Sequence, residues 1–181
     1  MLKKILIVVG VILLILVMAF FYLNNRNRTL SPPGSTELSG AGMNVAIEYS
    51  RPSVRGRMIF GEEAEGALQP YGVYWRLGAN EPTTLTVSED FVFGGKNIAK
   101  GSYTIYAIPR KMEMEVKLNS EVKFWGAFEP DTANDLVSTI LMMEQNPKVE
   151  QFTISTEPME GGVNVVFEWD TFRWELPLTK Q

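Results

Sequence analysis

The chain contains neither cysteine nor histidine. Without cysteine there is no disulfide, no thiolate nucleophile and no cysteine for lipid attachment. Without histidine the commonest general base at neutral pH is missing, together with Ser–His and Cys–His pairs and most zinc, copper and haem ligands. Carboxylate chemistry, a Ser–Lys pair and oxygen-ligated metals remain. We expect no cofactor and no metal site, and no recognisable catalytic constellation indicates an enzyme.

Positive charge is scarce after the first 28 residues. Residues 29–181 hold 13 Lys and Arg against 21 Asp and Glu, a net charge of −8. Nucleic-acid-binding proteins use basic surfaces to neutralise phosphates, so this acidity argues against a nucleic-acid partner. It also argues against broad electrostatic attachment to anionic lipid. The length of this body suits one domain with a single sizeable core.

One long apolar run is present, at residues 5–23, after a short tail of residues 1–4. A helix of that length spans the roughly 30 Å hydrocarbon core of a bilayer. We therefore predict a transmembrane anchor over 5–23, followed by a polar linker over 24–40. The alternative is a signal peptide cleaved after Ala19, which would leave the apolar segment 20–23 exposed at the new N-terminus.

The flanking charges give a weak orientation signal. Lys3 and Lys4 precede the apolar run, and Arg26 and Arg28 follow it. A short tail before the helix and a large body after it are typical of a signal anchor. We expect a single-pass protein of the bacterial inner membrane with its C-terminal domain on the extracytoplasmic side, in the periplasm. The sequence indicates no particular protein partner.

From Met43 onward the apolar residues recur with period two, which is the pattern of half-buried strands. Gly94-Gly95 and 160–162 read as hairpin turns. The sequence therefore predicts an all-β fold, an antiparallel β-sandwich over residues 41–181. Residues 135–143 suit a helix or a strand equally well. The alternating runs begin with Val45, Ile47 and Tyr49, and continue with Tyr103, Ile105 and Ala107, then Met112, Met114, Val116 and Leu118, then Val163, Val165, Phe167 and Trp169, and then Phe172, Trp174 and Leu176.

Two neighbouring segments, residues 49–61 and 71–82, have an unusual composition for a β-domain. They combine four arginines, a tryptophan, an amide and a carboxylate among glycines and prolines. Guanidinium groups bind carboxylate, phosphate or sulfate bidentately, and tryptophan stacks on flat or sugar faces. We predict a site here for a small anionic or carbohydrate ligand. The residues are Arg51, Arg55, Arg57, Trp75, Arg76, Asn80 and Glu81.

Two other interpretations of these residues stay open. In one, the arginines form a structural network with Glu81, Asp131 or backbone carbonyls, and Glu81 pairs with Arg55, Arg57 or Arg76. In the other, Glu81 is a catalytic residue of a glycan or peptide hydrolase, although such chemistry needs a second carboxylate and the sequence offers none that is convincing.

The remaining aromatic and acidic residues have simpler interpretations. The strand periodicity places Trp169 and Trp174 in the core, whereas Trp75 and Trp125 suit core and surface equally. Residues 129–135 group three acids and an amide, but the spacing matches no calcium loop, so we expect turn roles for Asp131 and Asn134.

Three segments resemble the signature blocks of the domain-of-unknown-function (DUF) 2911 family, found mostly in Bacteroidetes-type bacteria. They are YSRPSVRGRMIFG, LQPYGVYWRLGANEPTTLTVS and GGKNIAKGSYTIYAIP, and the resemblance covers about residues 42–178. It implies a secreted or envelope-facing β-sandwich without an established activity, and it favours a strand over 135–143. The chain departs from the family pattern at Arg110 and Met114, where a glycine and a tryptophan are usual. Many members also carry a cleavable signal or a lipoprotein cysteine, where this chain has an anchor.

Overall fold

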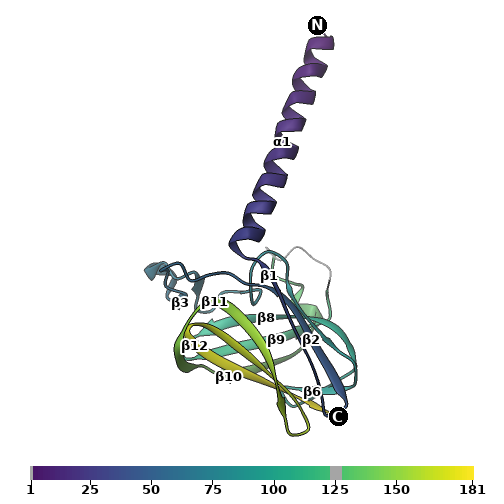
Figure 1. The fold of residues 1–181 in the computed structure, drawn as a ribbon, viewed down its shortest axis with the longest axis vertical. Coiled ribbons are helices and arrows are strands. Elements are labelled where there is room, and N and C mark those ends of the chain that lie inside the picture. Colours follow the sequence, from purple (N-terminus) through teal and green to yellow (C-terminus); the bar gives the residue numbers. More distant parts are fainter. Residues whose placement is uncertain (1, 123–127) are drawn as a thin grey trace.

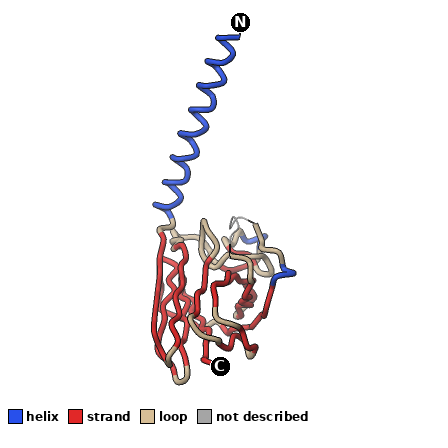
Figure 2. The backbone as a smooth tube through the Cα atoms, turned by 90° about the vertical axis from the view of Figure 1, so that its right-hand side faces the viewer, coloured by secondary structure: helices blue, strands red, loops and turns tan. Residues whose placement is uncertain are grey.

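The computed structural model describes residues 2–122 and 128–181, and shows a long N-terminal helix standing on a β-sandwich (Figure 1). The helix α1 spans Leu2–Leu30, and the C-terminus lies at the end of the sandwich away from it (Figures 1 and 2). The helix is long and apolar enough to cross a membrane, a test that an N-terminal signal sequence also passes.

The sandwich has two antiparallel sheets with the core between them. The larger sheet has the order β1-β2-β5-β8-β9-β10 and the smaller one β11-β12-β6-β7, while β3 and β4 form a short parallel pair. The strands are β1 (Pro33–Gly40), β2 (Met43–Ser50), β3 (Phe60–Gly61), β4 (Gln69–Pro70), β5 (Thr83–Val87), β6 (Phe91–Phe93), β7 (Lys96–Ile98), β8 (Gly101–Arg110), β9 (Glu113–Asn119), β10 (Asp135–Met142), β11 (Glu144–Met159) and β12 (Gly162–Lys180), with 3-10 turns η1 (Glu63–Glu65) and η2 (Thr132–Asn134).

The period-two pattern predicted this fold correctly. Residues 103–107 of β8 are buried on both faces, and the strand is central in its sheet, as the apolar pattern predicted. Gly94 and Gly95 form the β6–β7 hairpin with φ angles of 54° and 81°, values that glycine adopts at little cost. Residues 135–142 form a strand, β10, as the family resemblance favoured.

The two C-terminal runs merge into one long strand, β12. Apart from Gly162 and Val166, its buried residues are odd-numbered up to Trp169 and even-numbered from Trp174 onward. Such a change of phase needs one extra residue, and Asp170, with a φ of 53°, lies where the phase changes. The strand therefore continues through a local irregularity instead of ending there.

The linker predicted over 24–40 is wrong. Helix α1 continues to Leu30, and β1 pairs along its whole length with β2. The polar composition misled the prediction because β1 is an edge strand whose residues are at most half-buried. Thr36 of β1 also bonds Thr156 of β11 across the two sheets, hydroxyl to hydroxyl at 2.8 Å.

An aromatic cluster fills the centre of the core. Phe152 packs against Tyr49, Trp75, Trp169 and Trp174, with ring centroids 5.1 to 6.3 Å apart. Trp169 and Trp174 are almost completely buried, which confirms their predicted core position. Trp125 lies outside the described residues.

We predict that Phe152→Ala lowers the free energy of unfolding by about 3–5 kcal/mol, because it removes the ring at the middle of this cluster and leaves a cavity. Guanidinium denaturation of the full chain in a non-ionic detergent measures the change. Phe128→Ala is the control, since Phe128 is 69% exposed and its loss should cost less than about 0.5 kcal/mol. Equal effects of the two changes would contradict this description of the core.

Candidate functional site

The loop between β4 and β5, residues 71–82, carries four of the predicted site residues in a fixed conformation. Trp75 and Ala107 exchange two backbone hydrogen bonds, each 2.8 Å long. The Trp75 indole N–H donates to the Gly78 carbonyl at 3.1 Å, and the buried Thr83 hydroxyl donates to the Leu77 carbonyl at 2.6 Å. The loop therefore positions its side chains on a framework tied to the sheet.

Trp75 itself belongs to the core. Its side chain is 2% exposed and stacks on Trp169 with ring centroids 5.4 Å apart. Its ring is therefore unavailable for stacking on a sugar, and that predicted role is wrong. The reason is that residue 75 pairs with the central strand β8 by an isolated bridge, which turns the side chain inward.

A pocket of about 300 Å³ lies between the C-terminal end of α1 and the loops of the sandwich. Five of the seven predicted residues line it, Trp75 included. Its polar side chains include three arginines, two asparagines and a glutamine, and among the described residues no carboxylate lines it. These six are Arg55, Arg57, Arg76, Asn27, Asn80 and Gln69.

The three arginines of this pocket donate to backbone carbonyls. Arg55 Nη2 reaches the Leu30 carbonyl at 3.4 Å, and Arg76 Nη1 reaches the Asn80 carbonyl at 3.2 Å. Arg57 Nε and Nη2 donate to the carbonyls of Val54 and Ser53, at 3.1 and 2.6 Å. Within residues 2–122 and 128–181 none of the three forms an ion pair with a carboxylate.

The contacts of the arginines agree with the structural interpretation in one respect and disagree with it in another. Backbone carbonyls are partners of these arginines, as one alternative expected. The expected pairs of the arginines with Glu81 or Asp131 are absent from the described residues. Each guanidinium has five N–H donors, so each keeps donors that these bonds do not use.

The lining of the pocket combines a partly buried cation with a phenol. Burial lowers the pKa of Arg76, and the nearby Tyr74 opposes that shift. Burial raises the pKa of Tyr74 to about 12, with Arg76 acting against the rise and Glu129 adding to it. At neutral pH Arg76 is therefore charged and Tyr74 is neutral. The Tyr74 hydroxyl is buried and has no hydrogen-bond partner in the described part of the chain.

Asn80 and Glu81 connect the sandwich to α1. Asn80 Nδ2 donates to the Ser31 carbonyl at 3.2 Å. Glu81 forms an ion pair with Arg28 in the last turn of the helix. The partner of Glu81 is thus an arginine of the helix and not Arg55, Arg57 or Arg76.

Arg51 lies outside the pocket. Its Nε donates to the Phe152 carbonyl at 3.4 Å and its Nη2 to the Thr153 hydroxyl at 3.1 Å. Both acceptors are on β11, so Arg51 joins the end of β2 to the other sheet. Its role here is structural.

Glu81 lines a second, wider hollow of about 550 Å³ over β1, β2 and β5. Glu48 lines it as well, so the structure brings a second carboxylate to the same hollow as Glu81. The sequence pattern contains a signal for this, because Glu48 alternates with the buried Ile47 and Tyr49 and so points away from the core.

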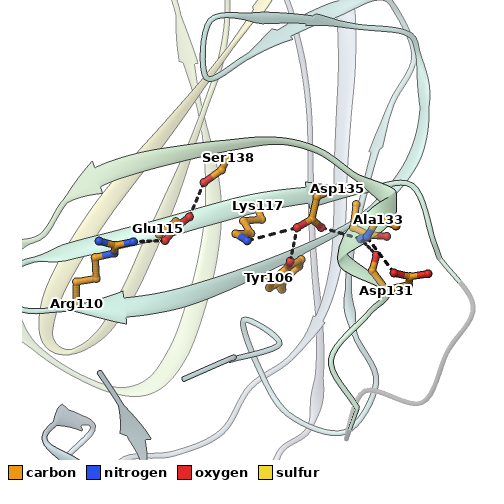
Figure 3. Close-up of polar contacts among 9 residues, drawn as sticks. Tyr106, Arg110, Glu115, Lys117, Asp131, Ala133, Asp135 and Ser138 are labelled. Carbon is orange, nitrogen blue, oxygen red and sulfur yellow. Dashed lines mark hydrogen bonds and ion pairs between the residues drawn. The ribbon is translucent and has the colours of Figure 1, made fainter. Parts of the chain in front are cut away.

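A separate polar cluster holds the start of β10 against the sheet (Figure 3). The Asp135 carboxylate accepts from Tyr106 at 2.7 Å, from Asn119 at 2.8 Å and from Lys117 at 3.4 Å. Burial and the Asp135 charge raise the pKa of Tyr106. Because Tyr106 is completely buried and Asp135 has three donors, this cluster is structural.

The acidic segment before β10 has the turn role that we expected. Asp131 Oδ1 accepts from the Ala133 N–H at 2.9 Å and caps η2 (Figure 3). The Asn134 N–H donates to the Asp131 carbonyl. In the described ranges no group of three or more Asp, Glu, His or Cys side chains is placed to hold a metal ion.

Sequence reasoning missed Asn27, Ser31 and Gln69 as pocket residues. Asn27 and Ser31 fell within the expected linker, and Gln69 belongs to a strand of two residues that shows no periodicity. Extending the predicted helix past Leu23 would have placed Asn27 on the helix, next to the domain.

We predict that Thr83→Val lowers the free energy of unfolding by about 1–3 kcal/mol, because it leaves the Leu77 carbonyl without its buried donor. Glu81→Gln should cost less than about 1 kcal/mol, because the ion pair with Arg28 is about half exposed. Thermal or chemical unfolding of the full chain in detergent measures both. A larger loss for Glu81→Gln than for Thr83→Val would show that the ion pair, not the buried hydroxyl, holds this loop.

Comparison with known proteins gives a family and no activity. The family described as "Protein of unknown function (DUF2911)" matches residues 31–178. No curated protein and no solved structure matches the chain. The match starts near the beginning of β1, about ten residues before the segment that the sequence motifs suggested, and it covers the whole sandwich up to Leu178 of β12. The chain belongs to the DUF2911 family.

Proposed function

We propose that this protein is a membrane-anchored recognition module whose pocket beside α1 binds an anionic group of its ligand. Arg55, Arg57 and Arg76 would supply the positive charge. Asn80 and the other amides would orient hydroxyl or amide groups next to the anion.

The observation that carries this proposal is the set of three arginines in one pocket without a carboxylate. The body has a net charge of −8, so acidic partners are abundant elsewhere on it. Charged groups that lose water without gaining a counterion are costly. Arg76 in particular is partly desolvated, and in the described residues only the Asn80 carbonyl accepts from it. A bound anion would offset that cost.

The donor chemistry suits carboxylate, phosphate or sulfate better than a neutral sugar. Planar guanidinium forks bind two oxygens at once, and such charge-assisted bonds are stronger than neutral ones. The buried Tyr74 hydroxyl supplies a further donor for an anion. A sugar-like ligand would need an exposed aromatic face, and Trp75 is buried.

The cellular setting belongs to the same proposal. The helix α1 would anchor the module in the inner membrane of a bacterium, with the sandwich on the extracytoplasmic side, in the periplasm of the cell envelope. The support is the apolar helix followed by an acidic body, together with the signal-anchor layout of the N-terminus.

A hydrolase acting on envelope glycan or peptide is the second candidate. It is favoured by the presence of Glu48 and Glu81 in one hollow, because two carboxylates are what glycoside hydrolysis needs. The pairing of Glu81 with Arg28 opposes it, since the carboxylate already has a fixed partner. Hydrolysis lost in both Glu48→Gln and Glu81→Gln, with unchanged melting, would favour this candidate.

We predict that inorganic phosphate binds the full chain saturably and that Arg76→Gln weakens this binding at least about tenfold. The loss of one charge-assisted hydrogen bond corresponds to about 1.5–3 kcal/mol. Isothermal titration in a non-ionic detergent at constant ionic strength measures the affinity, and the rise of the melting temperature with phosphate checks it. Arg110→Gln is the control, because it removes the same charge from an exposed side chain outside the pocket.

Two results would contradict the proposal. One is a wild-type chain without saturable phosphate binding. The other is an Arg76→Gln chain that binds phosphate like the wild type. If Arg76→Gln and Arg55→Gln both lower the melting temperature strongly without phosphate, the purely structural interpretation of the cluster is correct.

A further inference from the structure

The position of the pocket along α1 indicates where its ligand comes from. The apolar run ends at Leu23, and the pocket is lined by Asn27, Leu30 and Ser31. At about 1.5 Å per residue, Asn27 lies about 6 Å and Leu30 about 10 Å beyond the end of that run. A headgroup layer is about 5–8 Å thick on each side of the hydrocarbon core. With α1 crossing the bilayer as proposed, the pocket would lie at the level of the lipid headgroups and just outside them.

We infer that this pocket holds the phosphate of an anionic lipid headgroup from the bilayer that α1 crosses. The inference rests on the proposed function, because it names the source of the anion that the arginines bind. The lipid would approach along α1 and place its phosphate among Arg55, Arg57 and Arg76.

The contacts of two of the three arginines, Arg55 and Arg76, suit this geometry. Arg55 already touches the carbonyl of Leu30 at the helix end, so its guanidinium lies beside the last turn of α1. Arg76 bonds the Asn80 carbonyl, and Asn80 bonds the Ser31 carbonyl. The positive groups are thus tied to the residues that follow the membrane-spanning run.

Two exposed apolar residues adjoin pocket residues in the sequence and would suit contact with lipid. Met58 follows Arg57 and is 50% exposed, and Val73 precedes Tyr74 and is 45% exposed. On the helix, Tyr22 lies next to the end of the apolar run, and tyrosine is enriched where membrane helices reach the interface.

The net charge of the body indicates a specific site and not a general attraction. A domain with a charge of −8 is repelled by an anionic surface as a whole. Lipid binding would then be saturable, at one headgroup per chain, and would depend on individual arginines. Binding by general electrostatic attraction would instead weaken when any positive charge is removed.

The experiment uses the full chain in a maltoside detergent with phosphatidylglycerol and phosphatidylcholine of the same acyl chains. Native mass spectrometry counts the lipids retained by the wild type, Arg55→Gln, Arg76→Gln and Arg26→Gln. Arg26 is the matched control, because it lies in α1 beyond the apolar run and does not line the pocket. Inorganic phosphate titrated into the same variants tests the anion site separately.

We expect one phosphatidylglycerol per chain in preference to phosphatidylcholine, with retention about tenfold lower in Arg55→Gln and Arg76→Gln and unchanged in Arg26→Gln. Equal retention of the two lipids would overturn the inference, as would an equal loss in all three variants. If Arg76→Gln does not fold, Arg55→Gln decides, since Arg55 is an exposed loop residue.

The phosphate titration separates the lipid inference from the proposed anion site. Phosphate binding that depends on Arg76, without selective lipid retention, would overturn the lipid inference and leave the proposed anion site standing. The absence of both would overturn both.

Discussion

The packing of Trp75 between the two sheets is the constraint on which the site depends. Its ring stacks on Trp169 of β12, its backbone pairs with Ala107 of β8, and its indole N–H fixes Gly78. These three contacts are made by one residue, so the loop cannot move without opening the core. Arg76 and Asn80 take their positions from it. The pocket is therefore rigid because its loop is anchored in the aromatic core, although its lining is polar.

The fold was largely predictable and the site only in part. Alternation identified β2, β8, β9 and β12, since half-buried strands must alternate. It failed for β1, whose eight residues contain one large apolar side chain, Leu38, and whose pairing with β2 is visible only in three dimensions. The arginines, Asn80 and Glu81 stood out by composition. Their partners did not, because Leu30, Ser31 and Arg28 are distant in sequence and lie at the end of α1.

Trp75 shows why residue type alone does not assign a role. The same tryptophan suits a sugar-binding surface and a core, and the sequence around it is rich in glycine and polar residues. Its position was decided by a bridge to a strand about 30 residues away in the chain. Arg51 gives a parallel case. It is close in sequence to Arg55 and Arg57, yet it bonds β11 and takes no part in the pocket.

The continuous helix has a consequence for the reach of the domain. Seventeen flexible residues over 24–40 would have allowed the sandwich to travel up to about 55–60 Å from the bilayer. In the structure the helix continues to Leu30, and Arg28, Leu30 and Ser31 are bonded to the domain. With α1 as the proposed anchor, the sandwich would stand at one height with its α1 end toward the membrane. The pocket beside α1 would then meet only molecules that reach the bilayer surface.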